Sequence, residues 1–125
     1  MRRLLVVICL CLSSCSNSIS DADLVGEYVA AYRGDTATLS LHADHSYSHR
    51  VQLKDGERVG SGGSWKAYSQ GSPTVIELSD FAVLPSFENK KPTQWSIEVE
   101  HTWTGRVQIC FDSDVAYCYV KQSNT

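Results

Sequence analysis

Apolar and polar side chains alternate with a period of two along this 125-residue chain, and this alternation restricts the fold more than any other feature. In residues 46–54 the odd positions are mostly apolar and the even positions polar, and residues 94–103 repeat the pattern. Such alternation is typical of strands with one buried face. Turn signals such as Asp55-Gly56 separate eight segments that can be read as strands: 27–32, 36–42, 46–54, 58–68, 74–80, 94–103, 106–111 and 116–121.

Eight short strands without a long helical segment predict an all-β fold, an antiparallel eight-stranded meander. Because closure removes exposed edges, we expect the meander to close into a small barrel or a half-open cup. Residues 21–25 are expected to form one helical turn before the first strand. The glycines of residues 60–63 are expected to mark a bend or bulge at a barrel corner. A flexible loop that enters another protein's cleft has the same composition and is the alternative.

The first 14 residues have the three parts of a secretory signal, which are two arginines, an apolar stretch over residues 4–12 and small residues at its end. The apolar stretch has about half of the roughly 20 residues that a transmembrane helix needs, so a stable anchor helix is excluded. The sequence Leu12-Ser13-Ser14-Cys15 resembles the lipobox of bacterial lipoproteins. A plain secreted protein with an incidental cysteine is the alternative.

The resemblance to lipoproteins implies that residues 1–14 are removed and that Cys15 then carries several acyl chains, which anchor the chain to a membrane. Ser16 stands where the family associates aspartate with retention in the inner membrane, so we expect the outer membrane, with the domain facing the periplasm. The chain then divides into a signal peptide (1–14), a lipid attachment site with a short spacer (15–23) and a β-barrel domain (24–125).

The charge of the mature chain argues against nucleic acid as a partner. Removing the signal takes away two arginines and no acid, so 11 basic residues become 9 against 14 acidic ones, and the net charge changes from −3 to −5. Lys90-Lys91 is the only basic pair, and no basic stripe is present to follow phosphates. Membrane association is therefore expected to come from the lipid.

Two of the five cysteines leave with the signal and Cys15 is the lipid acceptor, so Cys110 and Cys118 remain. In an oxidising compartment this even remainder predicts one disulfide. If residues 113–115 form a three-residue hairpin loop, the two cysteines lie directly opposite each other, on the outer face of the sheet. A structural role is expected, because no Cys-x-x-Cys motif is present.

Three short motifs connect the domain to a known fold: Gly26-Glu27-Tyr28, Thr38-Leu39-Ser40-Leu41 leading into Asp44-His45-Ser46-Tyr47, and Gly63-Ser64-Trp65. With the eight-strand pattern, they resemble the small lipocalin-like, or calycin-like, lipoproteins. The resemblance implies a small barrel or cup with a ligand site inside it.

Two functions are consistent with the sequence, of which we expect the first and keep the second as the alternative. In the first, the domain is a non-enzymatic cup that binds a small apolar or amphipathic ligand through inward-facing side chains: Tyr47, His49, Trp65, Trp95, His101 and Trp103. In the second, it is a protein-binding inhibitor or immunity factor that protects the envelope from a lytic enzyme or a toxin. A packed interior favours the second function and an empty cavity favours the first.

The partner surface of the second function would be the glycine run or the long connection over residues 81–93, with its apolar residues Phe81, Leu84 and Phe87. The alternative for the long connection is that its apolar side chains plug the core.

No metal, cofactor or enzymatic activity is expected. His42, His45 and His49 are close in sequence, but alternation turns His42 outward and His49 inward, whereas zinc needs three or four converging ligands. The sequence contains no nucleophile elbow and no phosphate loop.

Overall fold

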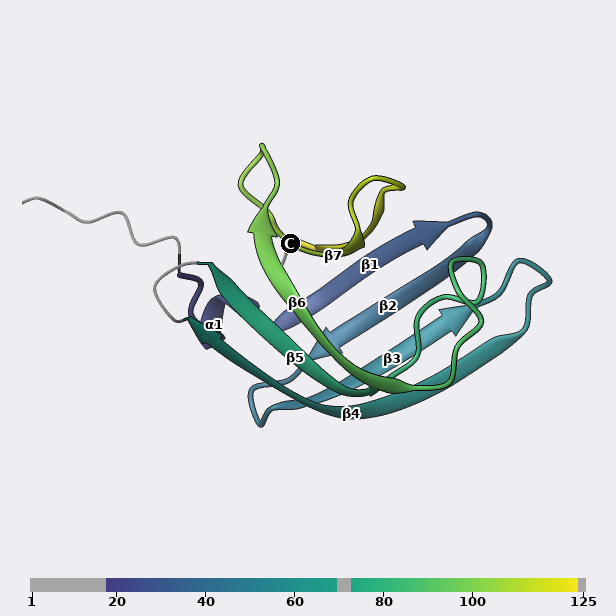
Figure 1. Cartoon of the computed structure of the whole chain (residues 1–125), viewed down its shortest axis with the longest axis horizontal. Helices are drawn as coiled ribbons and strands as arrows, with labels where there is room; N and C mark the ends of the chain where they lie inside the picture. The colour runs from purple at the N-terminus through teal and green to yellow at the C-terminus, as the bar shows by residue number, and fades with distance from the viewer. Residues whose placement is uncertain (1–17, 70–72, 124–125) are drawn as a thin grey trace, which may run out of the picture.

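A computed structural model describes residues 18–69 and 73–123, and over these residues the chain is a closed antiparallel β-barrel (Figure 1). Each strand pairs with the next one in sequence, and the last strand closes the barrel on the first through Tyr28 and Lys121. The elements are α1 (Asp21–Leu24), β1 (Gly26–Tyr32), β2 (Asp35–Leu41), β3 (Ser46–Gln52), β4 (Arg58–Ser69), β5 (Thr74–Phe81), β6 (Thr93–His101), β7 (Val107–Asp112) and β8 (Tyr117–Lys121).

The all-β fold, the eight-stranded meander and its closure are confirmed, and each predicted strand matches an observed one to within about two residues at each end. β3 ends two residues early, because Gly56 donates its backbone N–H to the carbonyl of Leu53 and so starts the turn there. The predictions for the signal peptide and for lipid attachment at Cys15 lie outside the described residues.

The barrel has two ends. At the α1 end lie α1, the turns over residues 42–45 and 102–106, and the last described residues, 122–123. At the opposite end, here called the loop end, lie the turns over residues 33–34, 53–57 and 113–116 and the long connection over residues 82–92. In Figure 1, α1 is at the left and the turns that follow β1 and β3 are at the right.

The glycine run belongs to a strand and not to a flexible loop. β4 pairs with β3 over Arg58–Ser64 and then with β5 over Trp65–Ser69, so the glycines lie where the strand changes partners. A Cβ on Gly63 would lie 2.7 Å from the carbonyl oxygen of Ser79, and one on Gly62 would lie 2.8 Å from that of Tyr47. The backbones of β3 and β5 therefore approach β4 so closely that only glycine fits at these two positions.

The disulfide between Cys110 and Cys118 is confirmed, and the two residues are directly opposite each other in β7 and β8. The hairpin loop is longer than the predicted three residues, because Asp112 pairs with Tyr117 and leaves residues 113–116 as the turn. A bulge at Phe111 compensates for the additional loop residue. The bridge lies on the outer face, since Ile109 and Tyr119 beside it are completely buried.

We expect Gly63→Ala to lower the free energy of unfolding by about 1–3 kcal/mol, because the added methyl group forces β4 away from β5. Gly60→Ala is the matched control in the same strand, since a Cβ there meets nothing within 4 Å and should change stability by less than about 0.5 kcal/mol. Urea unfolding followed by circular dichroism measures both. Equal effects at the two positions would contradict the close approach at Gly63.

Candidate functional site

A hydrogen-bonded chain of polar groups runs through the barrel interior. His49 is 1% exposed, and its Nε2 lies 2.8 Å from the hydroxyl of Tyr119. That hydroxyl is 3.1 Å from the hydroxyl of Tyr117, which accepts a hydrogen bond from the backbone N–H of Leu84. Because the Leu84 N–H can only donate, the hydrogen bonds run consistently in one direction. Tyr117 donates to Tyr119, and Tyr119 donates to His49. The chain links the barrel wall to the long connection at the loop end.

Aromatic rings occupy the space around this chain. The His49 ring stacks on Phe81 with centroids 4.4 Å apart, and Phe81 stacks on Phe111 at 4.9 Å. Trp95 meets the edge of Phe111 at 5.2 Å, and Phe87 lies 4.9 Å from Tyr117. An eight-stranded barrel is just wide enough for side chains to fill it. These rings are in contact with one another, so the interior is a packed core.

Burial keeps the polar groups of this core neutral. It lowers the pKa of His49 to about 4 and raises the pKa of the Tyr119 hydroxyl well above its usual range. It also raises the pKa of Tyr47 to about 12, with a further contribution from the charge of Asp80. Near neutral pH the interior therefore carries no charge from these groups, which suits a structural role.

Four of the six predicted lining residues contribute to this packed interior. Tyr47, His49 and Trp65 are buried, and Trp95 is partly buried against the core. Trp65 is at the α1 end, where its indole N–H donates to the carbonyl of His42.

The prediction that His101 and Trp103 line the interior is wrong, because both are exposed. β6 ends at His101, which is exposed, and the chain then turns over residues 102–106. Trp103 lies in that turn and is 99% exposed. His101 is the last residue of β6, at the rim of the barrel, and Trp103 lies beyond the end of the strand, where alternation no longer assigns a face.

The apolar residues predicted as a partner loop plug the barrel instead. Phe81 and Leu84 are completely buried, and Phe87 packs against Tyr32 and Tyr117. These side chains are therefore not offered at the surface, and the alternative interpretation of the long connection is the correct one.

Asp35 ties together three connections at the loop end. Its carboxylate is 3% exposed and accepts hydrogen bonds from the backbone N–H of Lys54, at 3.1 Å, and of Ser86, at 2.9 Å. The hydroxyl of Ser86 in turn donates to the carbonyl of Tyr32. The alternation pattern gives no indication of this role for Asp35, although an aspartate next to a turn commonly accepts backbone N–H groups.

Burial by itself raises the pKa of Asp35, but the hydrogen bonds from Ser86 and Lys54 and the charge of Lys54 outweigh it, so the pKa lies below its usual range. The stabilisation is therefore present above the unfolded-state pKa of about 3.9 and is lost as the pH falls through the lower folded-state value.

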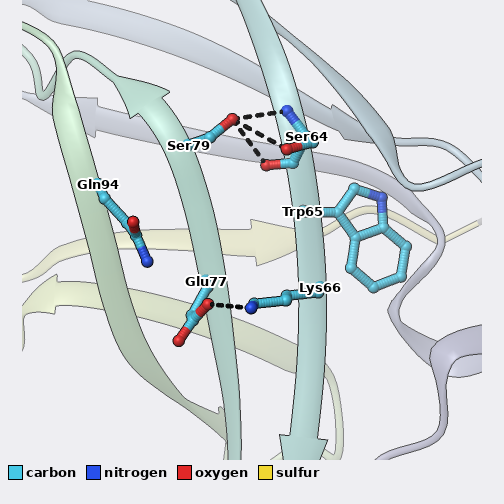
Figure 2. Close-up of a pocket in the computed structure, with 6 residues that line it drawn as sticks. All are labelled: Ser64, Trp65, Lys66, Glu77, Ser79 and Gln94. Atoms are coloured by element: carbon cyan, nitrogen blue, oxygen red, sulfur yellow. Dashed lines mark hydrogen bonds and ion pairs between the residues drawn. The ribbon is translucent and has the colours of Figure 1, made fainter.

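A shallow hollow of about 310 Å³ lies on the outer face of β4, β5 and β6 (Figure 2). Figure 2 shows Ser64 and Ser79 pointing toward each other and Lys66 pointing toward Glu77, with the Trp65 ring directed away from them. The two serine hydroxyls are 3.1 Å apart, and Lys66 Nζ is 3.1 Å from Glu77 Oε2. The serines bond to each other and not to a base, so this arrangement is not that of an activated nucleophile.

Residues 18–69 and 73–123 contain no group of three or more His, Cys, Asp or Glu side chains that could hold a metal ion. Within the same ranges, no helix is long and apolar enough to cross a bilayer.

These contacts define the class of protein: a small closed antiparallel β-barrel with a packed aromatic interior, compatible with a lipocalin-like fold. No protein-family model, no curated protein and no solved structure matches the chain.

We expect the stability of the barrel to fall by about 3 kcal/mol between pH 7 and pH 4 through His49 alone. The unfolded chain takes up a proton at His49 below pH 6.5, whereas the folded chain does so only near pH 4. His49→Phe removes this titration and keeps a ring against Phe81, so the pH dependence should become shallower by that amount. Urea unfolding at a series of pH values measures it.

His101→Gln is the control for this series, because it removes an exposed histidine and should retain the wild-type pH dependence. If His49→Phe also retained the wild-type dependence, His49 would not be the buried neutral group described above.

Asp35→Ala should lower the free energy of unfolding by about 2–4 kcal/mol, because two backbone N–H groups lose their acceptor. Asp55→Ala is the matched control, since this exposed aspartate accepts a single hydrogen bond from Glu57 and should cost less than about 1 kcal/mol. Urea unfolding at pH 7 compares the two. Hydrogen exchange at Lys54 and Ser86 should rise in the first variant only, and an unchanged exchange rate would contradict the role given to Asp35.

Proposed function

We propose that this chain is a lipid-anchored protein of the bacterial envelope that faces the periplasm and binds a protein partner without catalysing a reaction. Its class would be an inhibitor or immunity factor directed against a lytic enzyme or a toxin. The observation that carries the proposal is the packed interior, in which His49 and the surrounding rings fill the place that a small ligand would need. Binding would then use the outer surface.

The membrane part of the proposal has its support in the sequence. Cys15 follows a short apolar signal in a lipobox-like context, and Ser16 after it favours the outer membrane. The first described residue, Ser18, is three positions further along and leads directly into α1. A lipid on Cys15 would therefore hold the α1 end toward the membrane and leave the loop end free.

The loop end has the properties of a protein-binding surface. Asp35 connects three of its segments, so the surface is ordered before a partner arrives and loses less conformational entropy on binding. Exposed charges of both signs surround this end, and Val59 and Val115 add exposed apolar area. A charged rim around apolar groups is common in protein interfaces.

Site-specific photo-crosslinking in intact cells tests the proposal. A photoreactive residue replaces Lys91, an exposed residue of the long connection, and the matched control replaces Glu98 on the outer face of β6. We expect one protein adduct of fixed mass from position 91 and none from position 98. Native mass spectrometry of the purified protein should show no bound small molecule.

Two outcomes would contradict the proposed function. One is the absence of an adduct at position 91 together with a co-purifying small molecule of fixed mass, which would favour a ligand-binding barrel. The other is equal labelling at both positions, which would indicate contacts without a defined binding surface.

A further inference from the structure

The turn between β6 and β7 carries the most exposed large apolar side chain of the described residues. Trp103 is 99% exposed, whereas Val59, the next most exposed, reaches 48%. Figure 1 shows this turn projecting beyond the arrowhead of β6. An indole held almost entirely in water contributes no packing to the barrel, so fold stability does not explain its presence.

The turn is ordered despite its exposure. Thr102 donates its backbone N–H to the carbonyl of Arg106 at 2.7 Å, and Gly105 donates to the carbonyl of Thr102 at 2.8 Å. The Thr102 hydroxyl also accepts from the backbone N–H of Arg106 and lies 2.9 Å from the hydroxyl of Thr104. These bonds hold the backbone on both sides of Trp103, so the indole is presented from a fixed position.

This turn is at the α1 end of the barrel. Asp23 of α1 lines the same surface hollow as Gly105 and Arg106, together with Lys121 of β8. Lys121 joins β8 to α1, because its ammonium group donates to the backbone carbonyl of Asp23. Trp103 and the beginning of the described chain therefore share one end of the molecule.

The distance from this end to the proposed lipid is short. Ser18 follows Cys15 by three positions, and a fully extended chain over three residue steps spans about 11 Å at most. Acyl chains on Cys15 would keep the α1 end close to the headgroups of the membrane. Trp103 projects from that same end.

We infer that Trp103 inserts into the headgroup region of the membrane that holds the lipid anchor and acts as a second attachment point. Indole rings prefer this region, where the ring lies against apolar chains and the N–H meets water. Arg106 and Lys121 lie beside the same hollow and can pair with lipid phosphates. The inference rests on the proposed anchoring at Cys15 and adds an orientation: the α1 end faces the bilayer and the loop end faces away.

Because the lipid on Cys15 already holds the protein at the membrane, a weak contact through Trp103 is sufficient to orient it. A single tryptophan would not hold a free protein on a membrane, but an attached chain experiences a high effective concentration of headgroups. A contact of modest strength then fixes the tilt of the barrel. With the lipid as its single attachment, the barrel would sample many orientations.

Fluorescence quenching by brominated lipids tests the insertion. The lipidated protein is purified from membranes and reconstituted into vesicles of phosphatidylethanolamine and phosphatidylglycerol, with or without bromine near the headgroup end of the acyl chains. Subtracting the emission of Trp103→Phe isolates position 103 from Trp65 and Trp95. We expect bromine to reduce that difference emission by about half or more and the bilayer to protect it from aqueous iodide.

A second variant moves the exposed indole to the opposite end of the barrel. Val115→Trp in the Trp103→Phe background places an indole in the turn over residues 113–116, at a position that is 41% exposed. Bromine should leave this emission unchanged, and iodide should quench it. Quenching by bromine from both positions would overturn the proposed orientation.

The remaining outcomes separate the inference from the anchoring on which it rests. If the protein floats with the vesicles but Trp103 stays open to iodide and unaffected by bromine, the inference is wrong and the anchor stands. If mass spectrometry finds no acyl chains on Cys15, both are wrong. A photoreactive residue at position 103 that labels a protein in cells, and not a lipid, would also overturn the inference.

Discussion

The hydrogen bond from the backbone of Leu84 to the hydroxyl of Tyr117 joins the long connection to the polar chain that ends at His49. Without this bond the connection would have to bury an unpaired N–H group, which is unfavourable in an apolar interior. With it, the connection folds into the barrel, buries Leu84 and brings Phe87 against Tyr117, next to the stack of His49, Phe81 and Phe111. The packed interior, and with it the argument for binding at the outer surface, depends on this arrangement.

The two ends of the barrel are built differently. At the loop end, the buried carboxylate of Asp35 holds separate segments together. At the α1 end, Tyr28 donates its hydroxyl to the carbonyl of Leu24 and so fixes α1 over the opening, while Asp21 pairs with His45 from outside. The loop end is thus a stiff surface on the side opposite α1. The α1 end is covered by a short helix, with the exposed indole of Trp103 beside it.

The sequence predicted the strands well, because one buried face imposes a period of two that local composition records directly. It predicted the disulfide pair correctly even though the loop was one residue too short, since the bulge at Phe111 restores the register. It placed His101 and Trp103 in the interior although both are exposed, because alternation does not reveal where a strand passes the rim of the barrel. It also left the role of the connection with Phe81 open, because an apolar loop can equally face a core or a partner.

Closure of the barrel through β1 and β8 has a consequence for how the chain acquires its structure. The first and last strands are separated by nearly the whole domain, so their pairing needs a contact of very high sequence separation. Such topologies fold slowly compared with those built from local contacts. The sheet also keeps two open edges until β8 is in place. A chain of this design therefore forms its closed barrel only once every strand is available, because no subset of consecutive strands can close the sheet.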